Sequence, residues 1–304
     1  MNVLINILEQ GLLFSIVAIA VYITYKILDF PDMSVDGTFP MGAAISASLL
    51  VQGVNPWISI LLAALGGALA GAVTGIMHVK LKIDNLMAGI LMMIGLYSIN
   101  LRIMGKANVP LFNVNNIFKY NVPAIVIIAA ALIIVKILLD LYLKTKSGFL
   151  LIAVGDNEQV VSSLGVNKDM VKILGLLISN ALSATAGAVT AQYQGFADVG
   201  MGTGTVVMGL AAVIIGTSLF EKMSFIKATT LSIIGAIIYK GAIALVLKYG
   251  AVIGLTANDL KLMTAIIVVI ALCSNNGVFR MKKKKLIEGG EKNNVKSNTT
   301  MQGV

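Results

Sequence analysis

Charged residues, histidine and cysteine are all scarce in this chain of 304 residues. Asp, Glu, Lys and Arg together make up 12% of the sequence, about half the share that is usual in soluble proteins. Hydrophobic residues reach 58%, and the mean hydropathy is +0.92. A globular domain of this length cannot hide so much apolar surface, so the composition excludes a soluble enzyme and predicts a chain surrounded by lipid.

The few reactive side chains form no recognisable catalytic or metal site. Cys273 is the only cysteine, which excludes an internal disulfide, and His78 stands alone near an expected membrane boundary. The sequence contains no nucleophile–base set, no metal-ligand spacing and no Gly-x-x-x-x-Gly-Lys-Ser/Thr loop for phosphate. We therefore expect no enzyme activity, no metal and no cofactor, and no binding of ATP by this chain through a P-loop.

The net charge of +9 has a simpler explanation than nucleic acid. The basic residues gather in short connections and in the segment 280–285, not in a basic domain. Positive charge kept on the cytoplasmic side is typical of membrane proteins. We expect no nucleic-acid partner, a multi-pass protein of a plasma membrane, an external N-terminus and a cytoplasmic C-terminus.

Charge-free runs define the membrane layout. Crossing about 30 Å of hydrocarbon takes about 20 helical residues, so the uncharged run 37–79 must be broken, and Gly53-Val-Asn-Pro56 supplies a turn. We predict an all-α polytopic fold of about nine spans, within a range of eight to ten; the ten-span alternative adds an element over residues 1–9. The nine predicted spans are 10–28, 38–52, 57–79, 84–104, 122–143, 170–194, 204–219, 226–248 and 261–279.

Two segments resemble each other at a distance of 166 to 167 residues. Phe30-Pro-Asp-Met-Ser-Val-Asp-Gly37 precedes Met41-Gly-Ala-Ala, and Phe196-Ala-Asp-Val-Gly-Met-Gly202 precedes Met208-Gly-Leu-Ala-Ala. Five predicted spans separate the two copies, and an odd number inverts the second. Inverted repeats with discontinuous helices are typical of transporters. We therefore predict a transmembrane domain over 1–280, with inverted halves at about 10–143 and 170–279, and a disordered basic and polar cytoplasmic tail over 281–304.

Each repeated segment precedes a helix that is too short to cross. Residues 41–52 would span roughly 18 Å. We expect Asp36 or Thr38 to cap this first short helix, and Thr203 or Thr205 to cap the second. Non-helical backbone at membrane depth survives where protein or a watery cavity satisfies it, so these segments are also candidates for lining the route of a polar solute.

Charged residues at membrane depth leave an alternative open. Asp36 and Asp198, one in each repeat, could couple transport to an ion gradient in a secondary transporter. Lys136 is expected to pair with Asp140, four residues on, and to reach the interface. Lys240 lies nearer the middle of its helix, which leaves open both a snorkelling side chain and a role in lining a cavity or a subunit contact.

The longest cytoplasmic connection, 144–172, contains a short polar helix. Asp156 is placed as its N-cap, Gln159 as the third helical residue and Gly165 as its stop. Val160, Val161 and Leu164 would lie on one side. Joining two spans does not require such a helix, so we expect a partner to dock on it.

The motifs around this helix resemble the permease subunits of bacterial ABC importers of the branched-chain amino acid and ribose group. The Ala-x-Gly-x-Asn…Gly-Val pattern reads Ala153, Gly155, Asn157, Gly165 and Val166. The similarity continues through 181–190, 195–204 and 209–216, and residues 32–44 are most similar to the subgroup linked to tryptophan and other aromatic amino acids.

The resemblance implies a type II importer fold and an ATP-driven, inward alternating-access mechanism. Its expected partners are two copies of an ABC ATPase, a second permease copy, an extracytoplasmic binding protein or lipoprotein, and membrane lipid. The implied ATPase contact is the coupling helix 156–165, with Asp156, Asn157, Glu158, Gln159, Val160, Val161, Leu164 and Gly165. The implied substrate pathway contains Asp36, Gly37, Thr38, Phe39, Met41, Asn85, Met92, Tyr97, Gln192, Gln194, Asp198, Met201 and Thr203.

Overall fold

The fold is described from a computed structural model of the chain. It covers residues 2–119, 122–220 and 226–250, together with 262, 264–266 and 268–269. Most of the predicted span 261–279 and all of the predicted tail 281–304 lie outside the described residues.

The described part is almost entirely helical, and six helical segments are long and apolar enough to cross a membrane. Each contains an 18-residue window with a mean hydropathy of at least 1.2. The six segments are Leu4–Ile27, Pro56–Val79, Asn85–Met104, Ala124–Leu143, Lys168–Gln194 and Ala228–Val246. Two shorter apolar helices, Val35–Val51 and Thr205–Leu219, complete the set. The chain is therefore a multi-pass membrane protein.

The helices follow the predicted segments closely. Helix α1 (Asn2–Tyr22) continues as a π-helical turn, Ile23–Ile27, and residues 2–9 extend it instead of forming a separate element. The seven predicted segments from 38–52 to 226–248 each correspond to one helix. These are α2 (Val35–Val51), α3 (Pro56–Val79), α4 (Asn85–Met104), α5 (Ala124–Leu143), α8 (Lys168–Gln194), α9 (Thr205–Leu219) and α10 (Ala228–Gly250).

The predicted start of the first short helix is wrong. Helix α2 begins at Val35, after Ser34, and Pro40 lies inside it instead of before it. The amide N–H groups of Gly37 and Thr38 already bond to the carbonyl oxygen of Ser34. A proline within an apolar helix is tolerated where neighbouring segments satisfy the freed backbone groups. At 17 residues, or about 25 Å, α2 is nonetheless short for a span.

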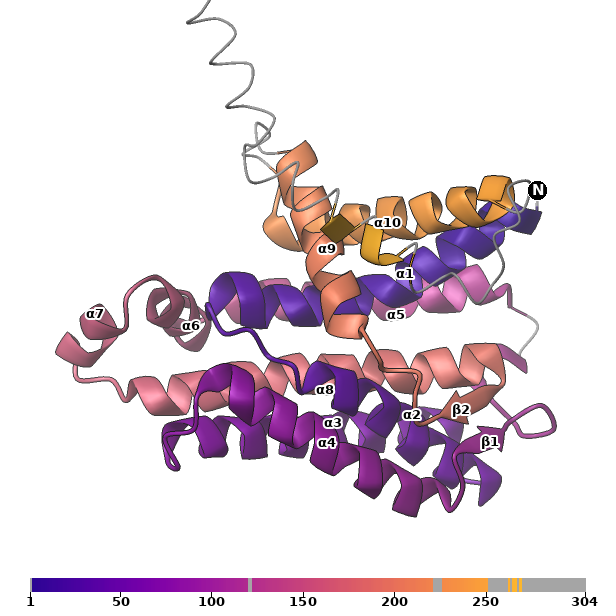
Figure 1. Cartoon of the computed structure of the whole chain (residues 1–304), viewed down its shortest axis with the longest axis horizontal. Helices are drawn as coiled ribbons and strands as arrows, with labels where there is room; N and C mark the ends of the chain where they lie inside the picture. The colour runs from indigo at the N-terminus through magenta and orange to yellow at the C-terminus, as the bar shows by residue number, and fades with distance from the viewer. Residues whose placement is uncertain are drawn as a thin grey trace, which may run out of the picture.

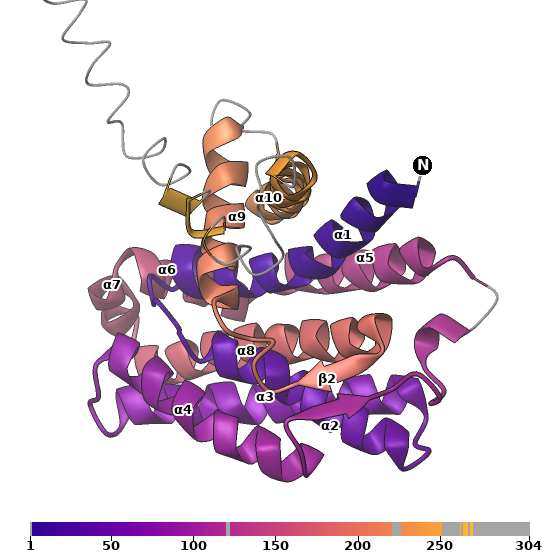
Figure 2. The same cartoon turned by 45° about the vertical axis from the view of Figure 1, so that its right-hand side comes forward.

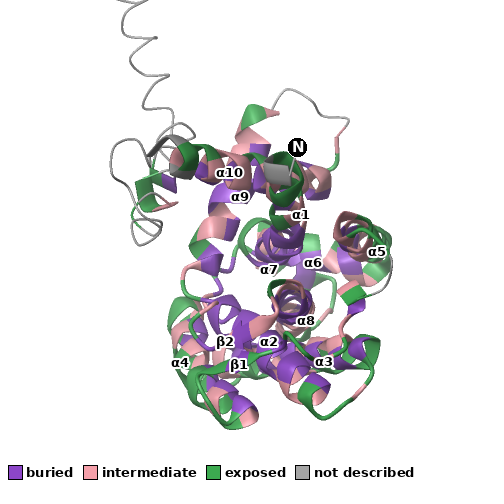
Figure 3. Cartoon of the chain, turned by 90° about the vertical axis from the view of Figure 1, so that its right-hand side faces the viewer, coloured by how far each residue is buried: buried purple, intermediate pink, exposed green. Residues whose placement is uncertain are grey.

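Helix α8 lies at the centre of the helical layers. In Figure 1 it runs between α2, α3 and α4 on one side and α1 and α5 on the other, and α10 lies beyond α1. Figure 3 shows the buried surfaces of α1, α2 and α8 facing one another. Glycines on α3 allow α3 and α8 to pack closely, because a Cβ on Gly71 of α3 would lie 2.3 Å from the carbonyl oxygen of Leu176 of α8.

Two small features mark opposite ends of the helices. Strand β1 (Asn108–Pro110) pairs antiparallel with β2 (Phe196–Asp198) at one end, although no strand was predicted there. The helices α6 (Lys146–Asp156) and α7 (Glu158–Ser163) lie at the other end (Figures 1 and 2). The connection 144–172 therefore contains two helices, where the sequence predicted one.

Lys136 is paired as predicted. Its ammonium lies 2.8 Å from Asp140 Oδ2 on the same face of α5. The same carboxylate also accepts hydrogen bonds from Lys227 and from Thr229 at the start of α10, both at 2.8 Å. Asp140 therefore links the end of α5 to the beginning of α10, two segments nearly 90 residues apart.

Candidate functional site

Asp36 caps a helix in the other half of the chain. The N-cap of α9 is Gly204, which has no side chain, and Asp36 of α2 supplies the missing acceptor. Its Oδ1 accepts the N–H of Val206 at 2.7 Å and the hydroxyl of Thr205 at 2.8 Å, and its Oδ2 accepts the N–H of Gly204 at 2.8 Å. The predicted cap of α2 is therefore wrong: this carboxylate stabilises the start of α9.

Asp198 has a different environment. Its Oδ1 accepts the N–H of Gly200 at 2.8 Å, and its Oδ2 accepts the side-chain amide of Asn108 at 3.2 Å, across the β1–β2 pair. Asp36 and Asp198 thus serve separate turns of the backbone. This arrangement gives no support to the alternative in which they act together as ion-coupling residues.

A cavity of about 350 Å³ lies between α2, α4 and the non-helical segment 199–204. It brings together four of the predicted pathway residues, Asp36, Gly37, Tyr97 and Thr203. Its complete lining is Asp36, Gly37, Pro40, Met93, Ile94, Tyr97, Ser98, Asn100, Val199 and Thr203. The α4 residues were mostly missed, although 93, 94, 97 and 100 have the spacing of one helix face.

Asn100 is the polar residue of interest in this cavity. Its side chain is fully buried, and its Nδ2 donates to the carbonyl oxygen of Gly37 at 3.2 Å. Its Oδ1 has no hydrogen-bond partner within the part of the chain that the structure describes. A buried acceptor without a donor is costly, so it favours a ligand or water that can donate.

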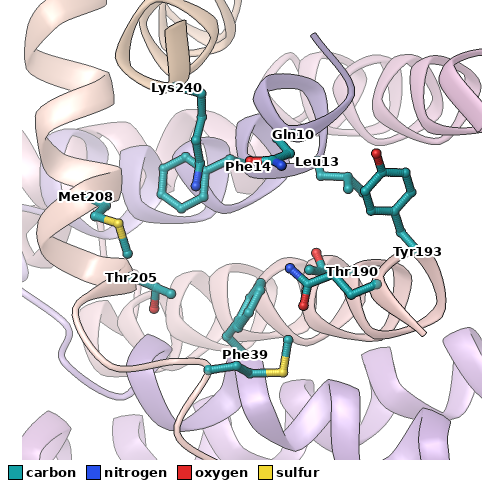
Figure 4. A pocket seen from close by; sticks show the side chains of 11 residues that line it. Gln10, Leu13, Phe14, Phe39, Thr190, Tyr193, Thr205, Met208 and Lys240 are labelled. Carbon is teal, nitrogen blue, oxygen red and sulfur yellow. The ribbon is translucent and has the colours of Figure 1, made fainter. Parts of the chain in front are cut away.

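A second, smaller cavity borders the same segment. It has a volume of about 130 Å³ (Figure 4). Its lining includes three residues of the predicted substrate pathway, Phe39, Gln194 and Met201. The segment that connects α8 to α9 therefore contributes Thr203 to one cavity and Met201 to the other.

The remaining predicted pathway residues do not line either cavity. Thr38 donates to Asn180 at 2.8 Å within the core, and Met41 approaches α3 near Gly66. Gln192 of α8 is buried and links α8 to α2, to α3 and to the connection before α5, because it donates to Ser46 and Ser59 and accepts from the N–H of Ile117. Asn85, Met92 and Asp198 are also absent from the two linings.

Helix α7 is capped at both ends, with one correction to the prediction. Asn157, not Asp156, is its N-cap and accepts the N–H of Gln159 at 2.9 Å, because Asp156 still belongs to α6. At the other end Gly165 adopts φ +74°. The N–H of Val166 then bonds to the carbonyl oxygen of Val161, which completes a Schellman ending.

The apolar residues of α7 divide between two faces, and were not all on one side as predicted. Val161 is fully buried, whereas Val160 is 50% exposed and Leu164 is 68% exposed. Val161 therefore fixes the helix to the protein, and the other two remain available for a contact. Asn157 and Gln159 are exposed beside them.

Two ion pairs that sequence reasoning missed fix α7 to the first turns of α8. Glu158 Oε2 lies 2.8 Å from the Lys168 ammonium, and the other oxygen pairs with Lys172. The two ammonium groups lower the pKa of Glu158 from an ordinary 4.5 to about 2. Separations of 10 and 14 residues across a turn leave no local sequence signal for these pairs.

Comparison with known families identifies the family to which this chain belongs. A family model described as "Branched-chain amino acid transport system / permease component" matches residues 3–273. The chain belongs to this family. The permease is therefore a membrane transport protein, as the motifs predicted.

The curated proteins that are similar in sequence are also transport permeases. The permease is 50% identical to the tyrosine transport system permease protein of Clostridioides difficile, over 93% of this chain and 95% of that protein. It is 28% identical to the nucleoside ABC transporter permease protein of Lactococcus lactis, over 67% and 74% of the two chains. Identity to the ribose import permease protein of Escherichia coli is also 28%, over 78% and 75%. No solved structure matches the chain.

Proposed function

We propose that the chain is the membrane subunit of an ATP-driven importer for an aromatic amino acid, with tyrosine as the first candidate. The observation that carries the proposal is the fixed, doubly capped helix α7 with Val160 and Leu164 exposed. In an ATP-driven importer, this helix would dock against a partner ATPase. The residues of the coupling helix 156–165 are proposed to form that contact.

The assembly follows from the family. We propose two permease copies, two ATPase subunits that bind the ATP, and an extracytoplasmic protein that delivers the solute. The end of the molecule with α6 and α7 is proposed to be cytoplasmic, because Lys26 in the π-helical turn after α1 and Lys80 and Lys82 between α3 and α4 belong to that end. The inverted halves, the ninth span and the cytoplasmic tail remain part of this proposal.

The proposed route passes the non-helical segment 199–204. This segment borders both cavities and is fixed to α2 through Asp36, so a movement of α9 against α2 would change both cavities together. Alternating access would arise if ATPase closure, transmitted through α6, α7 and α8, displaced the halves relative to each other.

The substrate class is supported by the larger cavity and by the similarity to the tyrosine permease. Met93, Ile94 and Tyr97 give an apolar wall, and Asn100 and Thr203 give polar groups. A volume of about 350 Å³ lies within the usual range of roughly 300–1,000 Å³ for small-molecule sites. A mostly apolar solute with a polar head fits this lining.

Uptake into proteoliposomes tests the proposal. The permease is reconstituted with its ATPase, with binding protein outside and ATP inside, and uptake of labelled tyrosine, tryptophan, leucine and a nucleoside is compared. We expect ATP-dependent accumulation of the aromatic amino acids, and none with an ATPase that cannot hydrolyse ATP. Accumulation driven by an ion gradient without the ATPase would overturn the mechanism, and preference for leucine or the nucleoside would overturn the substrate class.

A further inference from the structure

Lys240 is an ionisable residue within the apolar, membrane-spanning part of α10. It lines the smaller cavity with residues of α1, α8 and α9. In Figure 4 its side chain extends from α10 towards Phe14, on the side that faces Phe39 and Thr205. An ionisable residue at this depth is a candidate for function because lipid disfavours its charge.

The charge of Lys240 has no anionic partner in the residues that the structure describes. Asp140 and Glu158 are the acids of the ion pairs described above, and neither of them pairs with Lys240. Lys136, the other lysine at membrane depth, has its carboxylate at 2.8 Å. Lys240 instead places its ammonium 4.5 Å from the centroid of the Phe14 ring.

Phe14 is a fixed platform for this ammonium. Its ring is packed against the buried Tyr239, with the two ring centroids 6.1 Å apart. The face of an aromatic ring attracts a cation, but it offsets only part of the cost of removing an ammonium from water. An anion in the cavity would complete the compensation.

The rest of the lining suits the polar end of an otherwise apolar molecule. Gln10, Thr190 and Gln194 bring amide and hydroxyl donors, while Met201 and Met208 are soft apolar residues. Among the described residues that line the cavity there is no Asp or Glu. The cavity has a volume of about 130 Å³ and is partly open, so it can take the carboxylate end of a longer molecule.

We propose that Lys240 binds the carboxylate of the transported solute in this cavity, with Phe14 holding the ammonium in place. This inference rests on the proposed import of an amino acid. The cavity borders the same non-helical segment as the larger cavity, through Met201 on one side and Thr203 on the other. This position on the proposed route favours the solute over an anionic lipid headgroup.

The test combines uptake with a direct measurement of proximity. Lys240→Met, Lys240→Arg and the exposed external control Lys106→Met are reconstituted with the ATPase and binding protein. We expect Lys240→Met to lower tyrosine uptake at least tenfold, Lys240→Arg to recover part of it, and Lys106→Met to match the unmodified protein. Basal ATP hydrolysis and melting temperature check that each variant is folded and assembled.

Solid-state NMR supplies a readout that a purely structural role would not change. With lysine labelled by ¹⁵N and tyrosine labelled by ¹³C in its carboxylate, we expect dipolar coupling between the two in the unmodified permease and its loss in Lys240→Met. Normal uptake by Lys240→Met, or an absence of coupling in the unmodified protein, would overturn the inference. A defect that appears only in vesicles with anionic lipid would assign the site to a lipid headgroup and overturn it as well. Absence of tyrosine uptake by the unmodified protein would instead refute the proposed function.

Discussion

Asp36 and Val206 are joined by a hydrogen bond of 2.7 Å across 170 residues of sequence. The carboxylate lies in the first turn of α2, and the N–H lies in the first turn of α9. The two short helices therefore begin at a shared point, and the non-helical segment before α9 is held against α2. Any relative movement of the two helices must keep or break this contact.

Replacement of Asp36 tests the importance of that contact. We expect Asp36→Ala to destabilise the protein by about 2–4 kcal/mol, because three donors lose a charged acceptor in a buried site. The comparison variant is Asp198→Ala, which removes one backbone contact and one side-chain contact from a half-buried turn. Thermal unfolding in detergent measures both, and an equal loss in the two variants would show that the interhelical cap has no special role.

The proposed docking role of α7 predicts that replacing two exposed leucines will affect ATP hydrolysis differently. Leu164 on α7 is 68% exposed, and Leu81 in the α3–α4 connection is 65% exposed at the same end of the molecule. We expect Leu164→Asp to abolish the stimulation of ATP hydrolysis by loaded binding protein, and Leu81→Asp to leave it intact. Normal stimulation in Leu164→Asp would remove the basis for the proposed ATPase contact.

Acid should release α7 from α8. The folded-state pKa of Glu158 is lowered to about 2 from an ordinary 4.5, so its ion pairs contribute fully above about pH 4.5 and are lost as the pH falls towards 2. A spin label at the exposed Ser163, in a background without Cys273, reports the mobility of the helix. We expect constant mobility from pH 8 to pH 5 and a rise below pH 4. Glu158→Gln should already be mobile at pH 8, and a mobility that is low in this variant would contradict the prediction.

The close approach of α3 and α8 predicts opposite responses at two glycines. A Cβ on Gly71 would lie 2.3 Å from the backbone of Leu176, whereas a Cβ on Gly95 of α4 would meet nothing within 4 Å. We expect Gly71→Ala to destabilise the protein by about 1–3 kcal/mol and Gly95→Ala to stabilise it by up to about 1 kcal/mol. Unfolding by heat or denaturant in detergent measures the difference. Equal behaviour would mean that the helices can separate freely at Gly71.

The local character of the helix signals explains which parts of the fold could be predicted. Long apolar runs, and turn residues such as Asn55 and Pro56, placed seven predicted segments within a few residues of their helices, and an eighth, 10–28, began eight residues after the start of α1. The stop at Gly165 was also local, because a positive φ after a helix favours glycine. Asp156 and Asn157 are adjacent potential caps, and only the end of α6 decided between them.

The sequence by itself determined that this chain is surrounded by lipid, which long apolar segments form its helices and which family it belongs to, because hydropathy and motifs are properties of short segments. Only the tertiary structure decided which polar side chains pair with residues of other helices. Asp36 stabilises α9, Glu158 anchors α7 and Lys240 faces Phe14, and each contact joins residues from different helices. In an apolar interior each buried polar group must find a partner, and the packing of the helices determines which one is within reach.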